Sequence, residues 1–221
     1  MNRTGANTIR VLIADDHAIV REGLKQLLTK TGDITVGGEA GNGQDVLRLV
    51  RAREWDALLL DMSMPGRNGI ELIKQVRAER PKLPILVLSM HQEEQYAVRA
   101  LRAGASGYLN KDSASEQLVA AIRKVVGGGI FVSEAAGELL ARNTMRDVDA
   151  PLHTLLSDRE FEVFRMIAQG KTVTEIAAEL SLSVKTVSTH KTHLMEKLKL
   201  SNQADLIRYA LEQRLLGDQS S

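Results

Sequence analysis

The stretch Ala57-Leu58-Leu59-Leu60-Asp61 (ALLLD) decides the fold class. Four consecutive apolar residues lead directly to a carboxylate, without the alternation of apolar and polar residues that a half-exposed strand shows. A strand that is apolar on both faces is typical of a parallel sheet covered by helices on both sides. Two further runs share this character, VLIA at 11–14 and ILVL at 85–88. The sequence therefore predicts a three-layer α/β domain.

Working outward from these runs, strand-like and helix-like segments alternate over the first 126 residues. The predicted strand and helix pairs are 10–14 with 18–28, 34–37 with 45–53, 57–60 with 70–79, 83–88 with 93–103, and 107–109 with 116–126. Five such βα units predict a five-stranded, parallel, doubly wound sheet. The alternation stops after residue 127. We therefore predict a first domain at 1–127 and a linker at 128–154 that contains a short helix at 133–142.

The remaining residues, 155–221, predict a small all-α domain. Two S/T-x-x-E capping boxes, at 157–160 and 172–175, each precede apolar residues at helical spacing, and Ser183 is the expected N-cap of a third helix. The predicted helices are 158–169, 173–180, 184–199 and 202–215. The second and third of these, with the turn at 181–183, have the lengths of a helix-turn-helix, whose second helix enters the major groove of DNA.

Composition restricts the function further. The 221 residues contain no cysteine, which excludes disulfides, thiolate metal sites and thiol nucleophiles, and which suits a reducing compartment such as the cytoplasm. No apolar run is long enough to span a bilayer, so no membrane role is predicted. The net charge is +1 and does not by itself indicate a nucleic-acid partner. Locally, however, 183–199 holds four lysines against the single acid Glu196.

Charged and hydroxyl side chains follow the predicted strands at their carboxyl ends. Asp15 and Asp16 follow the first strand, Asp61 the third, Ser89 the fourth and Lys111 the fifth. In an open parallel sheet, ligands bind beyond this edge. Converging carboxylates repel one another unless a cation or a proton intervenes, and Mg2+ prefers a few carboxylates together with water and phosphate oxygens. The pattern predicts a Mg2+ site beside a carboxylate able to carry a phosphoryl group, with Lys111 as a counter-charge.

Residues 9–126 resemble the receiver domain of two-component response regulators, through LIADDH, LLLDMSMPGRNG, LVLSM and GYLNK. The resemblance implies that Asp61 accepts a phosphoryl group from a sensor histidine kinase. It also implies that Asp16 and Asp61 bind Mg2+ directly, that Asp15 helps through water, and that the backbone carbonyl of Ser63 is a further ligand.

The same resemblance implies roles around the phosphoryl group. Ser89 is the hydroxyl that would meet the group, Lys111 its charged partner, and Tyr108 an aromatic switch that turns inward. One position departs from the pattern, because Asp112 stands where many receivers have proline after the lysine. This difference excludes a cis-proline there.

Residues 155–215 resemble the LuxR-type helix-turn-helix, through LSDREFEVFRMIAQGKTVTEIAAELSLSVKTVSTHKTHLMEKLKL. With the receiver, this gives the architecture of NarL/FixJ-type response regulators. The resemblance implies a transcription regulator that binds double-stranded DNA and forms a homodimer when phosphorylated. It does not fix the base contacts, because the family often has a basic residue where this chain has Ser188.

A helical wheel divides the predicted helix 184–199 into two faces. One face gathers Val187, His190, Leu194 and Leu198, and the opposite face gathers Lys185, Ser188, Thr189, Thr192 and Lys199. An ordinary amphipathic helix with a solvated face fits this pattern as well. On the DNA-binding interpretation, phosphates would be contacted by Lys185 and Lys191 and base edges by Ser188, Thr189 and Thr192.

Other interpretations of the same residues stay open at this point. A haloacid-dehalogenase-like phosphatase would need a second aspartate two positions after Asp61, where Ser63 stands, so an enzyme is not predicted. A LuxR-type regulator controlled by a small molecule would need an aromatic-lined pocket, and aromatic residues make up only 3% of the chain. Gly41-Asn42-Gly43 completes no nucleotide-binding motif and predicts a turn. His190 and His193 lack further ligands for a metal.

Overall fold

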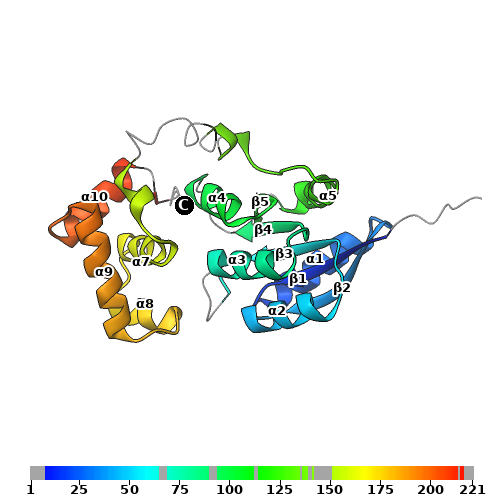
Figure 1. Cartoon of the computed structure of the whole chain (residues 1–221), viewed down its shortest axis with the longest axis horizontal. Coiled ribbons are helices and arrows are strands. Elements are labelled where there is room, and N and C mark those ends of the chain that lie inside the picture. Colours follow the sequence, from blue (N-terminus) through cyan, green and yellow to red (C-terminus); the bar gives the residue numbers. More distant parts are fainter. Residues whose placement is uncertain are drawn as a thin grey trace, which may run out of the picture. The chain divides into compact units, whose positions relative to one another are not determined.

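The computed structural model describes residues 8–64, 69–89, 94–111, 114–134, 136–138, 141, 151–213 and 215–216. The chain divides into two compact units, Met1–Met90 with Ala100–Ser133, and His91–Arg99 with Glu134–Ser221. Figure 1 labels the elements of both units. None of the helices in the described ranges is long and apolar enough to cross a membrane.

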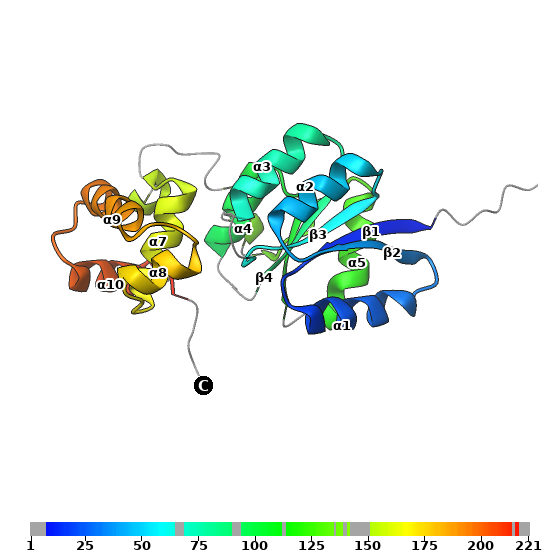
Figure 2. The ribbon, with the colours of Figure 1, turned by 90° about the horizontal axis from the view of Figure 1, so that it is seen from below.

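A five-stranded parallel sheet in the order β2-β1-β3-β4-β5 forms the centre of the first unit. Its strands are β1 (Ile9–Ala14), β2 (Ile34–Ala40), β3 (Ala57–Asp61), β4 (Ile85–Ser89) and β5 (Gly107–Asn110). The helices that alternate with them are α1 (Ala18–Thr29), α2 (Gly43–Ala52), α3 (Gly69–Glu79), α4 (Glu94–Ala103) and α5 (Ala114–Val126). Figure 2 shows α1 and α5 on one face of the sheet and α2 and α3 on the other. The predicted fold class is confirmed.

The apolar strand runs are buried on both faces, as the sequence predicts. Successive side chains of a strand point to opposite faces. On one face, Val11, Ile13 and Leu59 pack with residues of α1 and α5 in a single cluster. On the other face, Leu12 and Leu58 are equally inaccessible, with no exposed surface. This packing fixes the strand ends, and therefore the residues that follow them.

Strand β2 extends beyond its predicted end at residue 37 and continues to Ala40. The indole of Trp55 lies against this part of the strand. A Cβ atom on Gly38 would lie only 2.7 Å from Cη2 of Trp55, so the missing side chain leaves the ring its place. The predicted turn at 41–43 leads into α2, whose N-cap Asn42 accepts a hydrogen bond from the backbone N–H of Asp45 at 2.9 Å.

The chain returns to β5 after α5, which the sequence did not predict. Phe131 forms a parallel bridge with Gly107. The backbone N–H of Tyr108 donates to the carbonyl of Phe131 at 2.7 Å, and the N–H of Phe131 donates to the carbonyl of Ser106 at 3.1 Å. Of the predicted short helix at 133–142, residue 133 is not helical, residues 134, 136–138 and 141 are helical, and the other positions lie outside the described residues.

Helices around one apolar core make up most of the second unit. They are the 3-10 helix η2 (Leu152–Leu155), which was not predicted, and α7 (Asp158–Ala168), α8 (Val173–Glu179), α9 (Val184–Leu198) and α10 (Gln203–Glu212). Both predicted capping boxes form, and the Ser183 hydroxyl caps α9 through the N–H of Thr186. The turn before α9 uses a left-handed backbone at Ser181, with φ 53°. These features place α8 and α9 as the sequence predicts.

A buried histidine lies within the second unit. The side chain and backbone of His153 are only 1% exposed. The Tyr209 hydroxyl lies 3.1 Å from both the backbone N and Nδ1 of His153, while Nε2 has no hydrogen-bond partner in the described part of the chain. Burial, together with the positive charge of Arg99, lowers the pKa of His153 to about 4. The imidazole is therefore neutral at pH 7.

This histidine should make the second unit sensitive to acid. Because the pKa is about 4 in the folded state against 6.5 for an unperturbed histidine, the unfolded state binds the proton more readily, and stability falls as pH decreases from 6.5 to 4. The loss should reach about 3 kcal/mol below pH 4. Hydrogen-exchange protection of the α7 amides should report it. His153→Leu should remove this part of the pH dependence, and an identical dependence in both proteins would show that His153 is not responsible.

Candidate functional site

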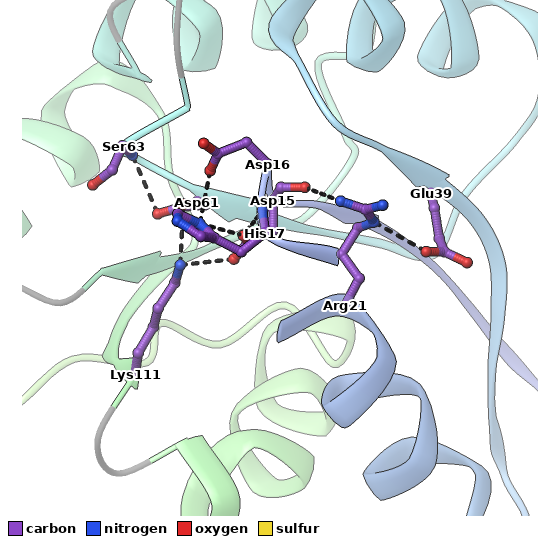
Figure 3. Close-up of polar contacts among 8 residues, drawn as sticks. All are labelled: Asp15, Asp16, His17, Arg21, Glu39, Asp61, Ser63 and Lys111. Carbon is purple, nitrogen blue, oxygen red and sulfur yellow. Dashed lines mark hydrogen bonds and ion pairs between the residues drawn. The ribbon is translucent and has the colours of Figure 1, made fainter. Parts of the chain in front are cut away.

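The carboxyl edge of the sheet brings the predicted acidic residues together (Figure 3). Ala14 of β1 pairs with Leu60 of β3, so Asp15 and Asp61 emerge side by side at the strand ends. Lys111, which follows β5, reaches the same point. Its Nζ lies 2.7 Å from Oδ2 of Asp15 and 3.0 Å from Oδ2 of Asp61.

Both carboxylates at the centre of the site are almost inaccessible. The side chains of Asp15 and Asp61 are each 1% exposed, and that of Lys111 is 11% exposed. The two oxygens of Asp15 are used, because Oδ1 accepts the backbone N–H of His17 at 2.8 Å and Oδ2 accepts from Lys111. Asp61 differs, since Oδ1 accepts the N–H of Ser63 at 3.2 Å but Oδ2 accepts no well-directed hydrogen bond from the described residues. Asp61 therefore keeps one oxygen available.

Electrostatics in the site follow from burial and from this ion pairing. Burial raises the pKa of Asp61, and the positive charge of Lys111 partly offsets that effect. Burial would lower the pKa of Lys111, but the hydrogen bond to Asp15 and the charge of Asp61 outweigh it, so the pKa of Lys111 is raised. One ammonium group thus faces several carboxylates, and the site keeps an excess of negative charge.

Asp16 and His17 complete a group of possible metal ligands. One ligand atom from each of Asp15, Asp16, His17 and Asp61 lies within 4.8 Å of the others. Oδ1 of Asp16 is buried and accepts no hydrogen bond from the described residues. Carboxylate oxygens that converge without donors are the ligands that a hard divalent cation prefers. The residues present therefore fit a divalent metal ion.

Ser89 and Tyr108, the other residues assigned from the sequence, lie on the neighbouring strands. Ser89 ends β4, has no exposed surface and pairs in register with Asn110. Tyr108 pairs with Val87 and is 8% exposed. Its side chain is thus already buried in this structure, whereas the sequence-based interpretation has it turn inward on phosphorylation. Asp112 lies outside the described residues.

Two residues near the acids were missed in the sequence. The Arg21 guanidinium donates to the backbone carbonyl of Asp15 at 2.7 Å and, through Nε, to Glu39 at 3.0 Å, which fixes the loop between β1 and α1. His17 has Nδ1 only 3.0 Å from Oδ1 of Asp16. The available signals were the position of His17 directly after the two acids and the spacing of Arg21 one helical turn later.

The two faces of α9 are those that the wheel predicts. Three of the four core residues are buried, with Val187, Leu194 and Leu198 at most 2% exposed, and His190 is half-buried. The opposite face is exposed at Lys185, Ser188, Thr189, Thr192 and Lys199. Lys191 is half-buried, and its Nζ lies 3.3 Å from Oε1 of Gln203 at the start of α10.

Hydroxyl groups on this exposed face have their protons engaged. Thr189 donates to the carbonyl of Lys185 at 3.0 Å, and Thr192 donates to that of Ser188 at 3.1 Å. Each threonine therefore presents an acceptor oxygen and a methyl group outward. Val184, the first residue of α9, was not predicted as part of this face, and its 49% exposure adds an apolar surface beside these groups. Such a face combines lysines, acceptors and methyl groups that suit phosphates and base edges.

A buried carboxylate beside two further acids and a lysine, at the carboxyl edge of a doubly wound parallel sheet, is typical of a receiver domain, and the second unit contains a helix-turn-helix. The chain matches the response regulator receiver domain family over residues 11–123 and the luxR family of bacterial regulatory proteins over 154–210. It is 37% identical to the oxygen regulatory protein NreC of Staphylococcus carnosus (strain TM300) over 216 residues, which are 94% of this chain and 99% of that protein. The chain therefore belongs to the response regulators with a LuxR-type DNA-binding domain.

Solved structures show the same similarity. RcsB of Salmonella enterica serovar Typhimurium, bound to promoter rprA in the presence of the phosphomimetic BeF3-, is 30% identical; the match covers 92% of this chain and 98% of that one, with a TM-score of 0.65. A structure of two RcsB dimers bound to two parallel DNAs is 32% identical, with coverage of 93% and 98% and a TM-score of 0.58.

Family membership decides between the interpretations that the sequence left open. The protein is a DNA-binding transcription regulator that acts through phosphorylation of its receiver. The receiver occupies the region where a ligand-controlled LuxR-type regulator would need its ligand-binding domain, so that alternative is wrong. The family consists of DNA-binding regulators rather than typical enzymes, and receivers in general bind Mg2+ at an acidic pocket of this kind.

Proposed function

We propose that Asp61 accepts a phosphoryl group from a sensor histidine kinase in a Mg2+-dependent reaction, and that this promotes dimerisation and promoter binding. One observation carries the assignment. Asp61 is 2% exposed at the end of β3, and its Oδ2 accepts no well-directed hydrogen bond from the described residues while Lys111 Nζ lies 3.0 Å away. A carboxylate oxygen with a free lone pair beside a fixed positive charge suits nucleophilic attack on a phosphoryl group.

In the transfer itself, an oxygen of Asp61 forms a bond to phosphorus while the bond from phosphorus to the donor imidazole nitrogen breaks. The leaving imidazole takes its proton from water, and an acyl phosphate remains on Asp61. Lys111 is placed to pair with the phosphoryl oxygens, and the Ser89 hydroxyl at the end of β4 to donate to one of them. Mg2+, when bound, neutralises charge between the donor phosphate and the carboxylates. Asp16, Asp61 and the Ser63 carbonyl would hold it directly, and Asp15 through water.

The first test uses acetyl phosphate, which needs no cognate kinase. With Mg2+, the full chain should gain the mass of one phosphoryl group, and hydroxylamine should remove it because the product is an acyl phosphate. Chelating the metal should prevent the gain, since the carboxylates would then repel the incoming phosphate. A mass gain that is stable to hydroxylamine, or one that persists at the same rate in chelator, would contradict the proposed chemistry.

We further propose that α9 enters the major groove of duplex DNA. Lys185 is exposed near the start of the helix and Lys191 lies about two turns further on, so both suit phosphates on the walls of the groove. Ser188, Thr189 and Thr192 lie between and beside them on the exposed face and suit base edges. The outward acceptor oxygens of the two threonines favour base amino groups as partners, and their methyl groups favour the thymine methyl.

This division of roles predicts different salt and sequence effects. Lys185→Ala and Lys191→Ala should each weaken binding to cognate and random DNA alike and reduce the slope of log affinity against log salt by about one unit. Thr192→Val should instead change the preference between sequences. Lys30→Ala, an exposed lysine after α1, is the matched control and should leave the slope unchanged. Equal effects of the lysine and threonine changes on all DNA sequences would refute the division.

The partners that follow are a sensor histidine kinase, double-stranded DNA and, after phosphorylation, a second copy of the chain. Dimers are favoured because a single helix-turn-helix makes a small interface, whereas two of them can bind half-sites about one helical turn apart. The RcsB dimers on DNA support this expectation for a similar protein. A cytoplasmic location stays a prediction, as do the domain limits 1–127, 128–154 and 155–221.

A further inference from the structure

His17 occupies an unusual position for a residue at the start of a helix. It is the N-cap of α1, yet its side chain makes no capping hydrogen bond. The ring faces the acidic site instead, with Nδ1 3.0 Å from Oδ1 of Asp16 and 3.3 Å from Oδ1 of Asp15 (Figure 3). Capping is therefore not the reason for the direction of this ring.

The backbone that carries the ring is held in place. The N–H of His17 donates to Oδ1 of Asp15 at 2.8 Å, and its carbonyl accepts the N–H of Arg21 at 3.2 Å. The Arg21 guanidinium in turn donates to the Asp15 carbonyl at 2.7 Å. The two contacts with Asp15 tie the first turn of α1 to the end of β1. The imidazole consequently starts from a fixed point beside the carboxylates.

The distances within the group suit ligands of one ion. Two ligands about 2.1 Å from a common cation, at the right angle of an octahedral site, lie about 3.0 Å apart. Nδ1 of His17 and Oδ1 of Asp16 have that separation, 3.0 Å. Oδ1 of Asp16 is buried and accepts no hydrogen bond from the described residues. Oδ2 of Asp61, a residue that is 2% exposed, is also buried and accepts none from them.

We propose that His17 binds the divalent metal of this site through Nδ1, alongside Asp16 and Asp61. The assignment of His17 as a metal ligand rests on the metal site proposed above. Imidazole suits transition metals, whereas Mg2+ prefers oxygen ligands. A nitrogen ligand therefore gives this site a stronger preference for Co2+ or Ni2+ over Mg2+ than an all-oxygen set of carboxylates would have. The 66% exposure of the His17 side chain leaves room for water and phosphoryl oxygens to bind the same ion.

Pulsed electron paramagnetic resonance of the full chain loaded with Mn2+ tests the bond directly. Wild-type protein should show the nuclear modulation of a coordinated imidazole nitrogen, and selective 15N labelling of histidine should shift it. His17→Ala should bind Mn2+ without this signal, and its affinity ratio of Co2+ to Mg2+ should fall by about tenfold. His193→Ala is the matched control, because that side chain is 55% exposed in the second unit, and it should retain both properties.

The results separate this ligand assignment from the proposed function. Mn2+ bound by wild type with no histidine nitrogen modulation overturns the role of His17 and leaves the carboxylate site intact. A modulation that persists unchanged in folded His17→Ala, as judged by circular dichroism, overturns it as well. The 15N measurement needs only wild-type protein, so it decides the matter even if the variant does not fold. Failure of wild type to bind any divalent ion overturns the metal site itself.

Discussion

Replacing Asp61 with asparagine should abolish phosphorylation by acetyl phosphate. The amide presents a nitrogen and a carbonyl oxygen in place of the carboxylate, so no acyl phosphate can form at that position. Asp15 is the obvious rival, because it is equally buried and also contacts Lys111. Its two oxygens already accept hydrogen bonds from His17 and Lys111, whereas Oδ2 of Asp61 accepts none that is well directed from the described residues. We therefore expect that Asp15 does not replace the missing acceptor.

A matched control lies at the other end of the same strand. Asp56 precedes β3 and accepts the backbone N–H of Arg10 at 2.7 Å, a bond that asparagine can keep. Asp56→Asn should be phosphorylated at the wild-type rate. Asp15→Asn should slow the reaction through the metal without moving the label to another residue. Labelling of Asp61→Asn at the wild-type rate, measured by intact mass, would show that the acceptor is elsewhere.

How much of the site could be predicted depends on whether a residue is set by a strand end or by side-chain packing. Asp61 and Asp15 were predictable, because an apolar run buried on both faces must stop where the first carboxylate appears, and parallel strands bring their carboxyl ends to one edge. The starts of the helices in the second unit were predictable because a capping hydrogen bond joins residues that are close together in the sequence. The hydroxyl of Ser183 and its capping partner lie within three residues of each other in the sequence.

The features that escaped prediction depend on contacts between distant segments. The return of Phe131 to β5 bridges residues that no local pattern connects, and the burial of Tyr108 follows from tertiary packing. The ring direction of His17 is a choice among rotamers of an exposed side chain, which the sequence does not encode by spacing. Strand β2 was predicted too short, since it continues through Gly37 and Gly38, which leave space for Trp55.

The other large effect expected is on the coupling between Asp61 and DNA. A beryllofluoride phosphoryl mimic should raise the dimer population and the operator affinity of wild type, by about 5- to 150-fold for a coupling of ordinary size. Ser89→Ala should still bind the mimic at Asp61 but should lose most of that increase. A phosphoryl group changes only local contacts, so its effect needs an element with two stable arrangements.

We propose that strand β5 and its neighbours in the first unit are this element. Ser89 has no exposed surface and pairs with Asn110, which lies two residues from Tyr108. If the phosphoryl group draws the Ser89 hydroxyl toward it, the packing beside the Tyr108 ring should change. Tyr108 is hydrogen-bonded through its N–H to the carbonyl of Phe131, at the beginning of the predicted linker. A shift of β5 would therefore reach the segment that leads to the DNA-binding domain without any new contact having to form.

This coupling can be measured by sedimentation and operator binding. Both measurements are made on wild type and on Ser89→Ala, each with and without the mimic. Mimic binding must be shown for both proteins, so that a lost response cannot be a lost ligand. Because Tyr108 is buried in this structure, we expect the packing around β5, rather than an inward turn of the ring alone, to supply the difference between the two states. Tyr108→Phe keeps the buried ring and should therefore retain more of the response than Ser89→Ala. A full response in Ser89→Ala, or no response in wild type, would refute this route from Asp61 to the linker.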